Sequence, residues 1–182
     1  MTALLAVAWM AWARAEQRPA WGLAAGLAAV AAFFTKAAAA FFIAALGIEI
    51  ARVAFDAWRA GDADRRRHLA RTAWAVAGLA IAAIVAAAIF VMPWWNEYQF
   101  YNWQMSVTRK PSYTLGAVVD RASWLPIVQG LFAGMSIEVV TAIVACLAVA
   151  TRWHDARSAE RLLVLWIIVG CAELVVHDSG NE

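Results

Sequence analysis

The chain has 182 residues, of which 64% are hydrophobic, and its mean hydropathy is +0.65. Soluble domains are ordinarily about 45–50% apolar, so this composition argues against a soluble globular domain and predicts an integral membrane protein. The net charge of +2 is too small to indicate a nucleic-acid partner. We therefore expect an all-α, polytopic protein in which residues 1–182 form a single transmembrane domain.

The first apolar segment, residues 1–12, starts without a basic region and has no convincing small-residue cleavage site, unlike a secretory signal peptide. It is also short, because a helix needs about 20 residues to cross a hydrocarbon core of about 30 Å. At the other end, apolar residues 162–176 run directly into polar residues 177–182. We expect the chain to be a fragment of a longer protein.

The next apolar run, residues 21–50, contains Lys36, the only charged residue between Arg18 and Glu49. A lysine at the centre of a membrane helix costs about 2.5–3.5 kcal/mol, so it needs a partner or a break in the helix. One tilted helix would put Lys36 at mid-membrane. Two shorter helices meeting at Thr35 and Lys36 would put it toward the outer face, and the arginine positions favour this second arrangement.

Small residues recur at helical spacing before Lys36, at Gly22, Ala25, Gly26 and Ala29. Such residues let helix backbones approach closely in lipid. A general alanine bias of the sequence would produce the same pattern.

Further spans are predicted over residues 73–92, 125–150 and 162–176, which gives about five to six transmembrane helices. Short cytoplasmic loops carry an excess of Lys and Arg. Arginines gather in the loop after Ala54 and in the turn at 151–161: Arg59, Arg65, Arg66, Arg67, Arg71, Arg152, Arg157 and Arg161. Both are therefore expected on the cytoplasmic side.

The long loop between these spans, residues 93–123, is then extracytoplasmic. Aromatic residues are spread around a helix over 96–105, which is expected to lie in the membrane interface. Arg109 and Lys110 follow on the side where positive charge is scarce. They fit either an anionic ligand at the headgroup level or a solvated turn with nonspecific lipid-phosphate contacts.

Ionisable and sulfur-containing residues also occur near the C-terminus. Glu173 precedes His177 by four residues, so the two side chains can meet on one helix face, or Glu173 can reach the interface. His177 and Asp178 have side chains that can bind metals, but their spacing does not support a metal site, and none is predicted.

Cys146 and Cys171 are expected to pack as small hydrophobic residues without a disulfide.

A short apolar helix ending in Phe34-Thr35-Lys36, followed by a second apolar helix, resembles the G-L-A-x-L-T-K stretch of GT-C class membrane glycosyltransferases. The related members are the protein O-mannosyltransferases and aminoarabinose-transferase-like proteins of glycosyltransferase family 39 or 83. The loop residues 100–104 and the ending 177–182 also look like bacterial members of this group.

This resemblance implies transfer of a sugar from a polyprenyl-phosphate carrier to an acceptor on the extracytoplasmic face of the bacterial inner membrane, without a cofactor. Cations near the outer leaflet would stabilise the charge that develops on the leaving phosphate. The residues expected to bind the donor phosphate are Lys36, Arg109 and Lys110. Further residues are candidates for lining the site: Thr35, Glu173, His177 and Asp178.

The sequence departs from the family at the general base, which lies there on the first extracytoplasmic loop as an aspartate or acidic pair. Glu16 is the only carboxylate before Lys36, and it sits in a short linker with Arg14 and Arg18. We therefore expect no catalytic residue in this chain and no sugar transfer by this chain alone.

A non-enzymatic membrane protein, such as a transporter fragment or a lipid-binding scaffold, is the alternative. Transporters also break helices near the midplane, so a break at Lys36 does not discriminate. The long aromatic and cationic loop on one face only favours the enzyme.

Overall fold

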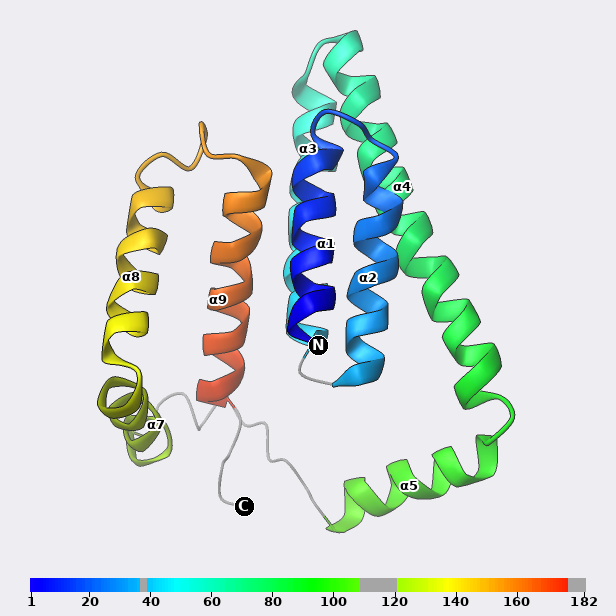
Figure 1. Cartoon of the computed structure of the whole chain (residues 1–182), viewed down its shortest axis with the longest axis vertical. Coiled ribbons are helices and arrows are strands. Elements are labelled where there is room, and N and C mark those ends of the chain that lie inside the picture. Colours follow the sequence, from blue (N-terminus) through cyan, green and yellow to red (C-terminus); the bar gives the residue numbers. More distant parts are fainter. Residues whose placement is uncertain (37–38, 109–120, 177–182) are drawn as a thin grey trace.

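The computed structural model describes residues 1–36, 39–108 and 121–176, and these form helices without any strand (Figure 1). The prediction of an all-α fold is confirmed. In chain order the elements are α1 (Thr2–Ala15), α2 (Trp21–Thr35), α3 (Ala40–Arg59), α4 (Asp62–Ala86), the π-helical η2 (Ala87–Val91), α5 (Trp95–Thr108), α7 (Arg121–Gly134), α8 (Ser136–Ala150) and α9 (Ser158–Val176).

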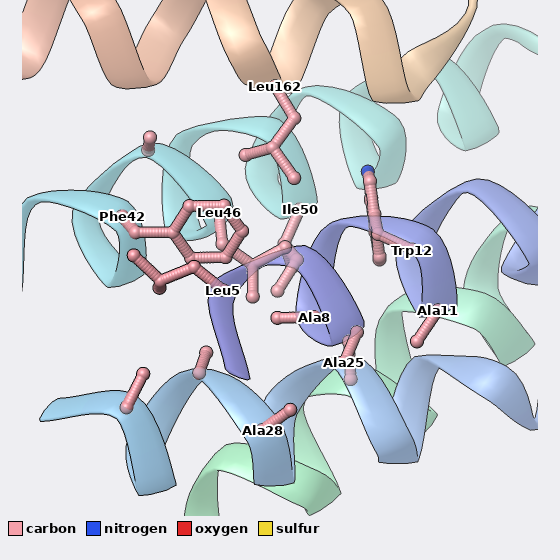
Figure 2. Close-up of a cluster of buried hydrophobic side chains, with 14 of the residues drawn as sticks. Leu5, Ala8, Ala11, Trp12, Ala25, Ala28, Phe42, Leu46, Ile50 and Leu162 are labelled. Atoms are coloured by element: carbon pink, nitrogen blue, oxygen red, sulfur yellow. The ribbon is translucent and has the colours of Figure 1, made fainter. Parts of the chain in front are cut away.

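One apolar core joins α1, α2, α3, α4 and α9. Figure 2 shows its centre, where side chains of α1 meet those of α2, α3 and α9. Trp12, Phe42, Leu46 and Leu162 are the largest apolar side chains that are fully buried there. Phe42 also packs edge-on against Trp166 of α9, with ring centroids 5.3 Å apart. The short helix α1 thus packs one face into this core, while Val7 and Met10 on its other face are exposed.

Helices α2 and α4 approach each other unusually closely because both carry glycine at the contact. A Cβ added to Gly26 would lie 2.5 Å from the carbonyl oxygen of Ala75, and one added to Gly78 would lie 2.3 Å from that of Leu23. Real Cβ atoms do not come this near to backbone atoms. The small residues before Lys36 therefore have a structural use, as the close-approach interpretation predicts.

The run 21–50 forms two helices, α2 and α3, so the two-helix alternative is the one that the structure has. The α-helix ends at Thr35 because the backbone of Lys36 is extended, with φ −161° and ψ 126°. Figure 1 shows α2 and α3 running in opposite directions from this break.

The arginine-rich segment after residue 59 is helical, and its prediction as a loop is wrong. Helix α3 continues to Arg59 and α4 already begins at Asp62, which leaves only a tight turn between them. Asp62 and Asp64 occupy the first turn of α4, where carboxylates interact favourably with the helix dipole. A hydropathy profile does not predict that α4 begins at these polar residues.

The predicted span over 125–150 is not one straight helix. Residues 128–134 and α8 are bent by 110° relative to each other at Met135. The backbone of Met135 lies outside the helical region, with φ −139° and ψ 40°, directly after Gly134. Glycine weakens a helix by about 1 kcal/mol relative to alanine, so it permits this break without altering the apolar character of the segment.

Among the described residues, one helix is long and apolar enough to cross a membrane by itself, the continuous Asp62–Val91 formed by α4 and η2. The bent pair Val128–Gly134 and Ser136–Ala150 passes the same criteria together. Only 17% of the most apolar 18-residue window of the first helix is buried. Most of the side chains in this window are therefore not buried within the described structure.

The aromatic segment 96–105 lies within α5, so its helical conformation is as expected. Figure 1 shows α5 running across the end of the long α4–η2 helix instead of continuing it. Trp95, Tyr98, Phe100, Tyr101 and Trp103 of this helix are all exposed. Its position at a membrane interface stays a prediction.

Candidate functional site

Lys36 lies at the end of α2 and is exposed. Its backbone N–H donates to the carbonyl oxygen of Ala32 at 3.1 Å, and its own carbonyl oxygen accepts from the N–H of Ala39 at 3.0 Å. The Thr35 hydroxyl donates to the same Ala32 carbonyl at 2.6 Å. Lys36 is thus fixed at the turn between two helices without being paired to a carboxylate in the described part of the chain.

Two apolar grooves of about 430 Å³ each lie beside the end of α2. They share Val30 and Phe34 as lining residues. One groove is bounded further by Phe33, three residues before Lys36 on α2, and by Ala40, four residues after it at the start of α3. The end of α2 that leads to Lys36 therefore borders a surface that is almost entirely apolar.

The π-helical turn η2 contributes to both grooves. Phe90 lines one groove and Val91 lines the other. Phe34 stacks on Phe90 with ring centroids 5.6 Å apart. Such π turns occur frequently at functional sites, because the extra residue in the turn redirects side chains. Here the turn directs aromatic surface toward the end of α2.

The other predicted site residues are placed only in part. Glu173 lies near the C-terminal end of α9, at the same end of the bundle as the C-terminal end of α2 (Figure 1). Arg109, Lys110, His177 and Asp178 lie outside the described residues. Thr35 and Lys36 therefore follow directly in the chain after Phe34, which lines both apolar grooves, but they are not themselves lining residues.

At the opposite end of the bundle lies a buried polar cluster that is not among the sites predicted from the sequence. Its centre is Glu49, which is fully buried and accepts two hydrogen bonds from Arg52, at 2.7 and 2.8 Å. The Ser158 hydroxyl also donates to Glu49. Arg161 Nε lies 3.5 Å from the same carboxylate. The cluster thereby joins α3 to the beginning of α9.

Residues of α1 and α4, and Glu16 directly after α1, also form hydrogen bonds in this cluster. Trp12 Nε1 donates to the Ser158 hydroxyl at 3.1 Å. Arg71 Nη2 donates to the carbonyl oxygen of Trp12 at 2.9 Å, and its guanidinium carbon lies 3.8 Å from the centroid of the Trp12 ring. Glu16 accepts the backbone N–H of Ser158 at 2.7 Å. Glu16 is therefore engaged at the end of the bundle remote from Lys36.

The i, i+3 and i+7 spacing of Glu49, Arg52 and Asp56 was the available sequence signal, since it places all three on one face of a helix. Arg52 indeed pairs with both carboxylates. The arginines of the α3–α4 and α8–α9 connections also lie at this end of the bundle (Figure 1). Their location at a common end agrees with the arrangement predicted from the loops.

Cys146 and Cys171 are free thiols, so the prediction that they form no disulfide is confirmed. Both line a third apolar groove, of about 750 Å³, between α8, α9 and the beginning of α3. They behave there as small apolar side chains.

Comparison of the chain with protein families, with curated proteins and with solved structures found no significant match.

Proposed function

We propose that this chain is the membrane-embedded part of a GT-C type glycosyltransferase that takes its sugar from a polyprenyl-phosphate donor. The observation that carries the proposal is the exposed Lys36, which lies two residues after Phe34, a residue that lines both apolar grooves. A lipid-linked phosphate combines an anionic group with a long hydrocarbon chain. A cation next to an apolar groove offers complementary chemistry to both parts.

The membrane orientation follows the arginines. The end of the bundle that carries the α3–α4 turn and the α8–α9 connection faces the cytoplasm in this proposal. Lys36 then faces the extracytoplasmic side of a bacterial inner membrane, together with the aromatic helix α5. The outward-facing apolar side chains of α4 and η2 support burial in lipid. In this proposal about five to six helices of this chain would span the bilayer.

In the proposed enzyme the general base comes from outside this chain. Glu16, the only carboxylate before Lys36, accepts the N–H of Ser158 at the cytoplasmic end. It is therefore unavailable to an acceptor hydroxyl near Lys36. The role of Lys36 is electrostatic, because a fixed positive charge stabilises the phosphate both when the donor binds and as the glycosidic bond breaks.

Replacing Lys36 with glutamine should weaken binding of a polyprenyl phosphate to the purified chain by about tenfold, the effect of losing one charge-assisted contact. Arg66→Gln is the matched control, because it removes one positive charge from an exposed position of α4 at the opposite end of the bundle. Native mass spectrometry in detergent measures both affinities. Equal affinities for the Lys36→Gln variant and the wild type would rule out the phosphate role.

The same grooves would also suit a non-enzymatic lipid-binding scaffold, which is the second candidate. Sugar transfer separates the two. A longer protein that contains this chain and an acidic extracytoplasmic loop should release polyprenyl phosphate from its sugar conjugate. Donor binding without any transfer by that protein would favour the scaffold.

A further inference from the structure

Another cavity, of about 260 Å³, lies at the arginine-rich end of the bundle. It opens beside the buried polar cluster and is lined by side chains from α1, α3, α4 and α9. Four of its lining residues are arginines: Arg52, Arg67, Arg71 and Arg161. This cavity is distinct from the apolar grooves near Lys36, because almost all of its lining residues are charged or polar.

The buried side-chain atoms at this cavity that have no hydrogen-bond partner are all nitrogen atoms. Arg71 is only 4% exposed, and its Nε has no hydrogen-bond partner. The Nε of Arg161, 8% exposed, makes no hydrogen bond either, although it lies within ion-pair distance of Glu49. The buried Nδ1 of His68 also lacks a partner. Buried donors are nearly always satisfied in native proteins, so the Nε–H groups of Arg71 and Arg161 call for an acceptor, whereas His68 Nδ1 can donate or accept according to its tautomer.

The carboxylates around the cavity are largely engaged elsewhere. Glu16 accepts the N–H of Ser158, and Asp56 pairs with Arg52. Asp64 is exposed in the first turn of α4. Four lining arginines thus face three lining carboxylates, of which Asp56 is ion-paired with Arg52, so the cavity keeps guanidinium donors for an acceptor ligand.

We propose that this cavity binds a phosphate group, supplied either by inorganic phosphate or by the headgroup of an anionic lipid. Guanidinium groups bind phosphate through strong, charge-assisted hydrogen bonds. Arg67, His68 and Arg71 follow one face of α4 at i, i+1 and i+4, and all three line the cavity. Basic pockets between helices on the cytoplasmic side are suited to lipid headgroups.

Arg67 is the best position for a test. It is exposed, whereas Arg71 also holds the carbonyl oxygen of Trp12 and its loss would perturb the core. The matched control is Arg66→Gln, which removes the same charge from an exposed neighbour that does not line the cavity. Binding to the delipidated chain is measured by native mass spectrometry with dioleoyl phosphatidylglycerol or dioleoylglycerol, and by thermal stabilisation with inorganic phosphate.

We expect saturable binding of phosphatidylglycerol, no binding of dioleoylglycerol, and an affinity about tenfold lower for Arg67→Gln than for Arg66→Gln. If inorganic phosphate also stabilises the protein in an Arg67-dependent manner, the free anion is the ligand; if it does not, the headgroup is. Equal weakening by the two substitutions, or no saturable binding of either phosphate probe, would overturn the proposal. Neither outcome depends on Lys36 and the donor site.

Discussion

Replacing Glu49 with alanine should destabilise the bundle by about 3–5 kcal/mol, the range for removing one partner of a buried ion pair. The Glu49 carboxylate is fully buried and accepts hydrogen bonds from both Arg52 and Ser158. Without it, the guanidinium groups of Arg52 and Arg161 lose the negative charge between them. Thermal or chemical unfolding in detergent, followed by the helical circular dichroism signal, measures the change.

Glu160→Gln provides the control for this prediction. Glu160 is also paired with an arginine, Arg152, at 3.3 Å, but the Glu160 side chain is 32% exposed. Exposed ion pairs contribute only about 0–1 kcal/mol. If Glu49→Ala were no more destabilising than Glu160→Gln, the polar cluster would have no part in holding α1, α3, α4 and α9 together.

Replacing Gly78 with alanine should destabilise the protein by about 1–3 kcal/mol, the usual effect of overfilling a tight contact. The new methyl group would lie 2.3 Å from the carbonyl oxygen of Leu23, and a backbone atom cannot rotate away as a side chain can. Helices α2 and α4 would have to move apart, and this would open the contact around Gly22 and Gly26. The same unfolding measurement detects the loss.

Gly47→Ala is the matched control, because a Cβ at Gly47 would meet nothing within 4 Å. This substitution should stabilise the protein by about 0.5–1 kcal/mol, since alanine is the better helix former. Opposite signs for the two glycine substitutions are therefore expected. A stabilising effect of Gly78→Ala would contradict the close approach of α2 and α4.

The features that follow from local residue properties were predictable from the sequence. Hydropathy identified the helical segments, and the charge of Lys36 together with the arginine positions favoured a break between two helices. The small residues Gly22 and Gly26 indicated a close helix contact, but the sequence does not say that α4 is the partner. That choice depends on Gly78, which lies more than fifty residues away.

The predictions that differ from the structure share a physical cause. A hydropathy profile averages over many residues, whereas a single backbone conformation or a single hydrogen bond can decide where a helix ends and what it contacts. The backbone of Met135 breaks the helix within the run 125–150, although the mean hydropathy of the run stays high. The polar beginning of α4 is helical because acidic residues stabilise its first turn. In the sequence Glu49 is only the next charged residue after Lys36. Its partner Ser158 is more than a hundred residues distant, so the spacing of residues does not identify this hydrogen bond.

The most direct test of the donor site compares a polyprenyl phosphate with the polyprenol of the same chain length, on the wild type and on Lys36→Gln. Both lipids can fill the apolar grooves, but only the first offers an anion to Lys36. The wild type should bind the phosphate about tenfold more tightly than the alcohol, and Lys36→Gln should lose this preference while retaining its affinity for the alcohol. An unchanged preference in Lys36→Gln would contradict the assignment of Lys36 as the phosphate-binding residue.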